Sequence, residues 1–231
     1  MLNVSHVDLH YGAAQILFDI SFEAKEATIT CVMGRNGVGK TSLLKAITGH
    51  HPISGGDIFI EGSGLGKTPA HHRAANGIAY VPQGRDVFPM LTVEENLQTG
   101  FSLLSRGARQ IPEEVFELFP VLKDMLNRRG GDLSGGQQQQ LAIGRALVTK
   151  PKVLVLDEPT EGIQPSVIKD IGRAIEYLRD KTGLTIVLVE QYLDFCRKLA
   201  NEVYIMDRGR VVHQGPASDL DKKNVRKHLS V

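Results

Sequence analysis

The chain has 231 residues, of which 42% are hydrophobic and 23% charged, and its formal net charge is +1. This size and composition are typical of one globular domain with a full hydrophobic core. So balanced a charge provides no general attraction for nucleic acid, and we expect no nucleic-acid partner. The N-terminus lacks the features of a secretory signal, and the longest apolar runs fall far below the roughly 20 residues of a membrane helix. We therefore expect a cytosolic chain.

The two cysteines, Cys31 and Cys196, are far apart in the sequence and belong to no C-x-x-C pair. We expect buried, reduced thiols at these positions, in preference to a disulfide or a metal site. The histidine pair His71–His72 lies in a polar stretch bounded by glycine and proline. We expect a solvated loop there, with metal binding as the less favoured interpretation.

The first third of the chain is predicted to be rich in strands, because β-branched and alternating apolar residues recur in it. Thr28–Met33 is a nearly continuous apolar run that ends at a glycine loop, as expected of a buried strand. After the loop, Thr41–Thr48 has helical spacing and precedes Gly49, a residue suited to a helix C-terminus. The other strands expected here are Leu2–Leu9, Ile16–Glu23, Asp57–Glu61 and Ile78–Val81.

The segment 83–150 has a helical pattern. Thr92 and Glu95 have the spacing of a capping box at the start of its first helix. Two further helices, the first interrupted by Pro120, are expected at Glu113–Asn127 and Ser134–Val148. Alternation of strand and helix then returns, in the order Lys152–Leu156, Ser166–Lys181, Leu184–Glu190, Leu193–Ala200, and closing strands at Glu202–Met206 and Arg210–His213. The chain is thus predicted to be an α/β protein whose core surrounds an inserted helical segment.

The segment Gly34–Thr41 fits the phosphate-loop pattern G-x-x-x-x-G-K-[ST] between a predicted strand and a predicted helix. Glycines let the backbone turn tightly, so that successive N–H groups can point at phosphates. Lys40 would add a positive charge at the β and γ phosphates, and Thr41 a hydroxyl for Mg²⁺. The helix that follows adds its positive dipole end. The alternative, a merely structural glycine turn, leaves this lysine unexplained.

Two carboxylates, Asp157 and Glu158, follow the apolar run Lys152–Leu156. In α/β proteins ligands bind at the carboxyl ends of parallel strands, so both side chains can reach the same crevice as the phosphate loop. Asp157 would hold Mg²⁺, and Glu158 would polarise the attacking water as general base. Such a pair would usually be solvated surface if the chain had no phosphate loop.

The segment Leu133–Gln137 reads Leu-Ser-Gly-Gly-Gln and resembles the signature of the ABC ATPase superfamily. Ser134 is a good helix N-cap, and Gly135 and Gly136 let backbone N–H groups approach an anion. The resemblance covers the whole chain. It implies a P-loop core with an antiparallel β subdomain, residues 1–82 and 151–231, and a helical signature subdomain, residues 83–150. It also implies that two ATP molecules lie between two head-to-tail subunits.

The resemblance implies roles for two more residues. Tyr11 would stack on adenine, although a single tyrosine near a strand is otherwise a packing residue, and Gln83 would sense Mg²⁺ and water. Two positions depart from the family: Gln191 replaces a common histidine, and Gln164 replaces the usual aspartate of the D-loop. Gln191 can still donate a neutral amide N–H to the γ-phosphate, but more weakly than a charged donor. The residues expected to hold ATP are Tyr11, Gly34, Arg35, Asn36, Gly37, Val38, Gly39, Lys40, Thr41, Ser42, Gln83, Ser134, Gly135, Gly136 and Gln137. The expected catalytic residues are Lys40, Glu158 and Gln191. The expected metal site consists of Thr41, Gln83 and Asp157.

Within the superfamily, the sequence looks most similar to the branched-chain amino acid and amide uptake branch, through the segments Val81–Phe88, Leu91–Leu97 and Leu188–Gln191. Four further segments resemble the urea-transport ATP-binding subunits: Phe116–Pro120, Arg128–Asp132, Ser134–Gln140 and Glu158–Pro165.

This resemblance implies an ATPase at the inner face of a cell membrane, paired with itself or a sister ATPase. It would dock on membrane permeases, with a periplasmic solute-binding protein as an indirect partner. Four apolar residues could line the docking groove or equally belong to the core: Phe88, Met90, Leu91 and Phe101. The rival hypothesis is a non-transport ABC ATPase that moves a soluble partner by nucleotide-dependent dimerisation.

Overall fold

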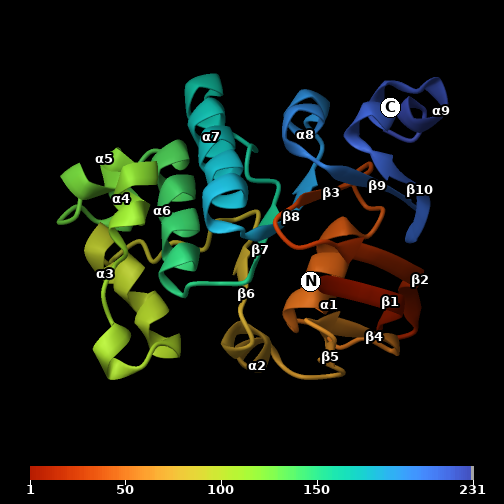
Figure 1. Cartoon of the computed structure of the whole chain (residues 1–231), viewed down its shortest axis with the longest axis horizontal. Coiled ribbons are helices and arrows are strands. Elements are labelled where there is room, and N and C mark those ends of the chain that lie inside the picture. Colours follow the sequence, from red (N-terminus) through yellow and green to blue (C-terminus); the bar gives the residue numbers. More distant parts are fainter. Residues whose placement is uncertain (230–231) are drawn as a thin grey trace.

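The computed structural model describes residues 1–229 and contains two β-sheets (Figure 1). The larger sheet has the strand order β10-β9-β3-β8-β7-β6. Its strands from β9 to β6 pair in parallel, and β10 pairs antiparallel with β9. The bounds are β3 Ile29–Met33, β6 Ile78–Val81, β7 Val153–Asp157, β8 Thr185–Glu190, β9 Glu202–Asp207 and β10 Arg210–Pro216.

The central strands β3, β7 and β8 are buried along their whole length. Alternate side chains enter two different cores, so that Cys31 and Met33 pack on one face of β3 while Val32 packs on the other. Burial on both faces explains why these strands are continuous apolar runs in the sequence. Their carboxyl ends meet at one edge, where the phosphate loop and the two acidic residues follow.

The smaller sheet is antiparallel, with the order β2-β1-β4-β5. Its strands are β1 Leu2–Tyr11, β2 Ala14–Ala24, β4 Gly55–Ile60 and β5 Ser63–Gly64. The helix α1, Lys40–Thr48, contacts both this sheet and strands of the larger one. The apolar face of the small sheet and α1 thus share the second core with Val32.

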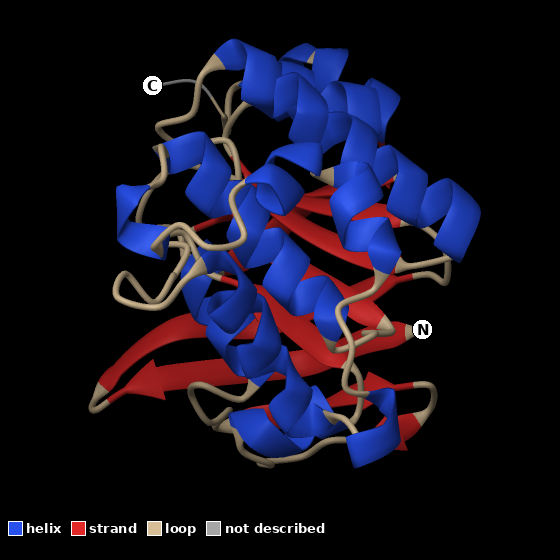
Figure 2. Ribbon diagram, turned by 90° about the vertical axis from the view of Figure 1, so that its left-hand side faces the viewer, coloured by secondary structure: helices blue, strands red, loops and turns tan. Residues whose placement is uncertain are grey.

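The other helices cover the opposite face of the larger sheet or extend beyond its β6 edge (Figures 1 and 2). Their bounds are α2 Ala70–Ala75, α3 Val93–Gln98, α4 Glu113–Leu118, α5 Pro120–Asp124, α6 Gly135–Val148, α7 Pro165–Thr182, α8 Leu193–Leu199 and α9 Lys223–Arg226, with 3₁₀ turns at Thr99–Leu103, Arg106–Ala108, Gly130–Asp132 and Ala217–Asp221.

Most predicted elements are confirmed. The predicted capping box at Thr92 forms, and Ser134, predicted only as an N-cap, begins a second capping box. Thr92 accepts from the backbone of Glu95, and Ser134 accepts from that of Gln137, with the reciprocal bonds also made. The expected interruption of the helix at Glu113–Asn127 is confirmed, because Pro120 cannot continue α4 and begins α5 instead. The expected end at Asn127 is wrong, since α5 ends at Asp124.

The expected loop at His71–His72 is also wrong, since both residues lie on the short helix α2 with their side chains exposed. The next residue, Arg73, is fully buried beneath this helix. Its guanidinium donates to the carbonyl oxygens of Ala46 and Ile47 at 2.7 and 2.9 Å, at the C-terminal end of α1. Arg73 therefore fastens α2 to α1 by satisfying carbonyls that the helix leaves unpaired.

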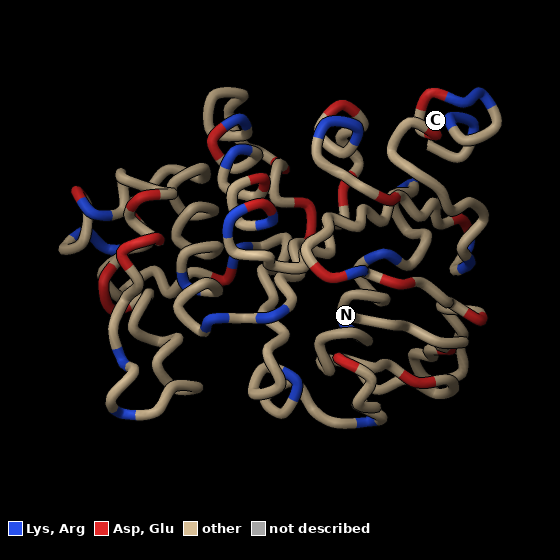
Figure 3. Tube along the Cα trace, in the orientation of Figure 1, with Lys and Arg blue, Asp and Glu red and all other residues tan. Residues whose placement is uncertain are grey.

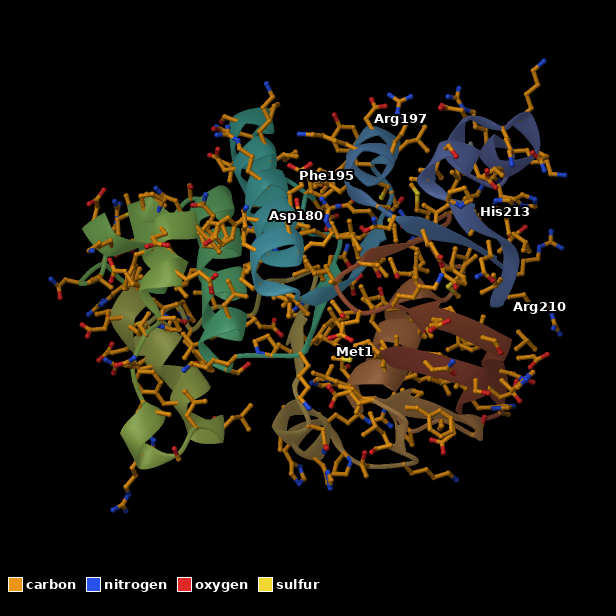
Figure 4. The ribbon with its side chains drawn as sticks, viewed as in Figure 1. Met1, Asp180, Phe195, Arg197, Arg210 and His213 are labelled. Atoms are coloured by element: carbon orange, nitrogen blue, oxygen red, sulfur yellow. The ribbon has the colours of Figure 1, made fainter. Side chains whose placement is uncertain are left out.

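Cys31 and Cys196 are free, buried thiols, as predicted, but the fold brings them together. Cys31 lies on β3 and Cys196 on α8, and their sulfur atoms are 2.7 Å apart. Phe195, which precedes Cys196 on α8, is labelled in Figure 4. A side chain at Gly172 of α7 would contact the Phe195 ring, so this glycine allows α7 and α8 to pack closely.

Charged residues of both signs are spread over all parts of the trace (Figure 3). Several form surface ion pairs, such as Lys25 with Glu202 and Arg197 with Asp194. Such exposed pairs each contribute little to stability. The basic C-terminal segment reaches the phosphate loop, where Arg35 donates to the carbonyl oxygen of Lys227 at 3.3 Å.

Candidate functional site

The loop between β3 and α1 has the backbone geometry that the phosphate-loop pattern predicts. Gly34 has a φ of 157°, and a Cβ there would lie 2.4 Å from the carbonyl oxygen of Met206. Gly39 has a φ of 106° and forms the N-cap of α1 without any side-chain capping bond. Only glycine accommodates the close contact at Gly34, and glycine readily adopts the positive φ of Gly39. The uncapped N–H groups at the start of α1 suit an anion.

Lys40 is buried at the centre of this loop. Its ammonium donates to the carbonyl oxygens of Gly34 and Arg35 at 2.9 and 3.0 Å. The same Nζ lies 3.5 Å from Oε1 of Glu158. Lys40 thus places one positive charge between the phosphate loop and the end of β7.

Asp157, the last residue of β7, is almost fully buried. Its Oδ2 accepts from the Tyr80 hydroxyl at 3.3 Å, whereas its Oδ1 has no hydrogen-bond partner within residues 1–229. Burial, and then the charge of Glu158, raise the pKa of Asp157 above its ordinary value. A buried carboxylate oxygen without a partner, close to the Thr41 hydroxyl, fits a hydrated divalent cation, which would restore the charged form.

Glu158 is held in an unusual backbone conformation, with a φ of 47°. Its N–H donates to the carbonyl oxygen of Val189 on the adjacent strand at 2.9 Å. Left-handed backbone at a non-glycine residue is uncommon and is enriched at functional positions. Here it turns the Glu158 side chain toward Lys40 and away from the strand direction.

Gln191 joins the phosphate loop to Glu158. Its Nε2 donates to Oδ1 of Asn36 and to Oε1 of Glu158, both at 2.7 Å. The amide therefore uses both of its N–H groups on residues that were predicted independently for the same site. Glu158 also accepts a long bond of 3.5 Å from Nε2 of Gln83.

A cavity of about 410 Å³ opens beside these groups and is large enough for part of a nucleotide. Tyr11 lies at its margin, 40% exposed, with its ring against His51 at a centroid distance of 4.2 Å. Residues predicted for ATP make up most of the lining, namely Tyr11, Asn36, Gly37, Gly39, Lys40, Thr41, Ser42, Gln83 and Glu158, with Ile16 added. Val38 points its side chain into the second core, so only its backbone can serve a ligand. A neighbouring hollow of about 330 Å³ adjoins Gly34, Arg35, Asn36 and Gln191.

The signature residues do not line this cavity. They lie at the start of the 14-residue helix α6, where Gly135 faces Arg85 and Gly136 faces Val167. Ser134 and Gln137 complete each other's capping bonds, so the side chain of Gln137 is used within its own helix. This end of α6 is a second glycine-rich helix N-terminus, and it does not line the cavity beside the first.

Sequence reasoning missed the residues that link these loops. Glu161 accepts from Gln83 Nε2 at 2.8 Å, and its carbonyl oxygen accepts from Arg85 at 3.1 Å. The signal available was Glu161 itself, a charged residue three positions after Glu158. Gln164, the departure from the expected D-loop aspartate, is the N-cap residue of α7 and makes no side-chain capping bond.

The family model that matches this sequence is described as ABC transporter, and it covers residues 17–161. That range includes the phosphate loop, the start of α6, and the acidic residues Asp157 and Glu158 at the end of β7. The chain belongs to the ABC transporter family. It is accordingly an ATP-binding and ATP-hydrolysing cassette.

Curated relatives cover nearly the whole chain. A high-affinity branched-chain amino acid transport ATP-binding protein of Pseudomonas aeruginosa is 43% identical, over 98% of this chain and 97% of its own. A probable branched-chain amino acid transport ATP-binding protein of Archaeoglobus fulgidus is 39% identical, over 95% and 94%. A glutamate/aspartate import ATP-binding protein of Escherichia coli K12 is 32% identical, over 94% and 91%.

Solved structures agree on the fold. A nucleotide-free ATP-binding cassette from an ABC transporter has a TM-score of 0.86 at 26% identity, and covers 98% of this chain and 95% of its own. Another ATP-binding cassette of an ABC transporter, in the ADP conformation, also scores 0.86, at 27% identity and over 98% and 97%. The predicted α/β cassette fold, with its antiparallel sheet and helical segment, is confirmed.

Proposed function

We propose that this ABC cassette powers a membrane importer, and that it hydrolyses ATP only when two subunits face each other. The observation that carries the proposal is the presence of two phosphate-binding helix ends, at α1 and at α6, that do not line the same cavity. A single chain would therefore supply only one half of each ATP site in a dimer. A second cassette, a copy or a sister subunit, would bring its Ser134–Gln137 to the phosphates held by the first.

In the proposed site, the loop Gly34–Ser42 holds the phosphates, and Lys40 moves from its carbonyl partners to the β and γ oxygens. Tyr11 stacks on adenine. Thr41 and Asp157 hold Mg²⁺, with Gln83 at its edge, and the ion neutralises charge on the phosphate oxygens. These oxygen donors are the type that Mg²⁺ prefers.

Glu158 acts as the general base in this proposal. Its carboxylate is surrounded by Lys40, Gln191 and Gln83, at 3.5, 2.7 and 3.5 Å. These donors fix the carboxylate where a water beside the γ-phosphate would be polarised. Gln191 supplies a neutral N–H to the same phosphate, so hydrolysis depends more on Glu158 than in relatives with histidine.

The dimer part of the proposal has a direct test. In Glu158→Gln the water is no longer activated, so ATP should accumulate between two subunits and light scattering should report a dimer. Glu202→Gln, a carboxylate at the start of β9 and outside the proposed site, is the control. A Glu158→Gln protein that stays monomeric with ATP and hydrolyses it at the normal rate would make the base assignment wrong.

The proposed docking face for a membrane permease is a cavity of about 520 Å³ between α1, α2 and α6. Its lining includes His50, Tyr80, Asp86, Leu103 and Arg145. Phe88, Met90, Leu91 and Phe101, expected to line the groove or the core, are not among its lining residues. Phe88 and Met90 are 48% and 70% exposed, so the core expectation is wrong for these two, and their place at a docking groove stays a proposal.

We propose that the protein acts at the cytoplasmic face of the membrane. Among residues 1–229, no helix combines the length and hydropathy needed to cross a bilayer. The boundary that we propose between the core (1–82 and 151–231) and the signature segment (83–150) runs along the docking cavity, whose lining comes from both parts. Occupation of the cavity would thereby reach the second half of α6.

For the solute, we propose urea, a related small amide or a branched-chain amino acid. The two branched-chain amino acid transport relatives support the broader class. The narrower choice of urea rests on the segments around Phe116, Arg128, Ser134 and Glu158. A periplasmic solute-binding protein would deliver the solute. The rival, a non-transport ATPase, is not favoured, since relatives from three solute classes are all named for transport or import.

The experiment is reconstitution with candidate permeases in proteoliposomes. ATP hydrolysis is measured with a solute-binding protein loaded with urea, acetamide, leucine or glutamate. We expect stimulation by urea, or by acetamide or leucine, and none by glutamate. Stimulation by glutamate alone would contradict the solute class, and failure to co-purify with any permease would favour the soluble-partner hypothesis.

A further inference from the structure

Glu190, the last residue of β8, is a carboxylate inside the protein that has no part in the chemistry described above. It is only 2% exposed. Ionised carboxylates are seldom buried unless charges or hydrogen bonds compensate them. The surroundings of Glu190 therefore need an explanation.

Its two oxygens serve two different loops. Oε1 accepts from the backbone N–H of Thr160 at 3.0 Å and from the Thr160 hydroxyl at 2.7 Å. Oε2 accepts from the backbone N–H groups of Gln191 and Tyr192 at 3.0 and 3.2 Å. Thr160 is two residues beyond Glu158, so one carboxylate holds the turn after the proposed base and the turn that carries Gln191.

We propose that Glu190 is the positioning residue that fixes Gln191 relative to Glu158. The inference rests on the proposed function, because it assigns the cause of the geometry in that site. Gln191 reaches Oε1 of Glu158 and Oδ1 of Asn36 at 2.7 Å from a backbone held by Glu190. A shift of about 1 Å between the two turns would separate these groups, and misplacement on this scale costs much of the rate of an enzyme.

An ionised carboxylate suits this position because both of its oxygens accept hydrogen bonds. All four contacts are donors to Glu190, and a carboxylate accepts at both oxygens. A glutamine of the same shape would turn its NH₂ group toward one pair of donors, leaving at least one backbone N–H unpaired. Burial raises the pKa of Glu190, and the bonds from Thr160, Tyr192 and Gln191 act in the opposite direction.

The test is steady-state ATP hydrolysis by the full chain with Glu190→Gln. We expect kcat to fall about tenfold or more, while KM for ATP changes less than about threefold, because the phosphate loop is untouched. Thr160→Val, which removes one of the four donors, should lower kcat severalfold with little effect on folding. Thr160→Ser keeps the hydroxyl and should recover most of the activity. Glu202→Gln, a carboxylate at the start of β9, is the matched control.

A double-mutant cycle decides whether Glu190 acts through Gln191. In a Gln191→Ala background, adding Glu190→Gln should lower kcat by less than about twofold. Full additivity of the two losses would overturn the proposal, and so would a Glu190→Gln protein with raised KM and unchanged kcat. Glu158→Gln separates this result from the proposed function. If that variant hydrolyses ATP normally, the site itself is wrong, whereas an inactive Glu158→Gln with an active Glu190→Gln overturns only the role of Glu190.

Discussion

The side-chain amide of Gln191 lies 2.7 Å from Oε1 of Glu158, although 33 residues separate them in the chain. The same amide nitrogen is 2.7 Å from Asn36 of the phosphate loop. The three segments that contain Asn36, Glu158 and Gln191 are far apart in the sequence and are thus joined by one neutral side-chain amide. Because an amide does not titrate near neutral pH, Gln191 can donate both hydrogen bonds at every pH at which the protein is folded.

Replacing Gln191 should change the rate and not the binding of ATP. We expect Gln191→Ala to lower kcat between about ten- and a hundredfold, as the loss of one donor to a transition-state oxygen does elsewhere. Gln191→His should retain turnover. Its kcat relative to the unmodified protein should rise as pH falls through about 6.5, where imidazole gains a proton. Complete loss of activity in Gln191→His, measured from pH 5.5 to 8, would contradict this account.

Asp157 should destabilise the protein in the absence of nucleotide and magnesium. Burial raises its pKa in the folded state, so the ionised carboxylate carries a penalty above that pKa, which fades as pH falls through it. Asp157→Asn should therefore raise the free energy of unfolding by about 1 kcal/mol at pH 7, with the gain shrinking toward pH 4. Urea denaturation at both pH values measures this. A variant that is less stable at pH 7 would exclude the penalty.

The same Asp157→Asn variant should lose the stabilisation that Mg-ATP gives the unmodified protein. A ligand that binds only the folded state raises stability in proportion to its affinity. Thermal unfolding with and without Mg-ATP reports this. Equal stabilisation of both proteins would show that Asp157 takes no part in holding the metal.

Arg73 should be among the residues most important for stability outside the site. Its guanidinium makes four hydrogen bonds to backbone carbonyls, two at the end of α1 and two, to Thr68 and Gly66, in the preceding loop. Lysine cannot reproduce this fork, so Arg73→Lys should cost about 2–4 kcal/mol. Arg106→Lys, at an exposed arginine, should change stability by less than about 0.5 kcal/mol. Equal effects on the urea midpoint would contradict the structure.

How much the sequence predicts depends on how local the signal is. The phosphate loop, the two capping boxes and the apolar central strands were all predictable, because each is written in consecutive residues. The helix α2 was not, since it spans only six residues and begins at Pro69 without a capping box. Its stability comes from Arg73 reaching α1, a contact that no local pattern reveals.

The candidate site divides in the same way. Lys40, Asp157 and Glu158 follow from motifs, whereas Glu190 and Glu161 are single carboxylates that each bind a partner far along the chain, 30 and 78 residues away. Sequence spacing gives no reason to choose them over other acids on the surface. The meeting of Cys31 with Cys196 was likewise invisible, because it requires the packing of α8 on β3.

These thiols should be unreactive in the folded protein. Both are buried, and burial, followed by the contact with Cys31, raises the pKa of Cys196. The thiolate is the reactive form, so reaction with a disulfide reagent such as DTNB at pH 8 should wait for unfolding. Two thiols should then titrate in guanidinium. Rapid reaction of one thiol without denaturant would contradict the burial of this pair.

The central claim is that a working site combines the phosphate loop of one subunit with the signature helix of another. Lys40→Ala removes the first half, and Gly135→Asp places a negative charge at the second, where the added Cβ would displace only the end of the flexible Arg85 side chain. Each variant alone should hydrolyse ATP at less than about a hundredth of the normal rate. A mixture of the two forms some dimers with one intact composite site, and should recover a measurable fraction of the activity. A mixture as inactive as its components, despite dimer formation by light scattering, would contradict the account.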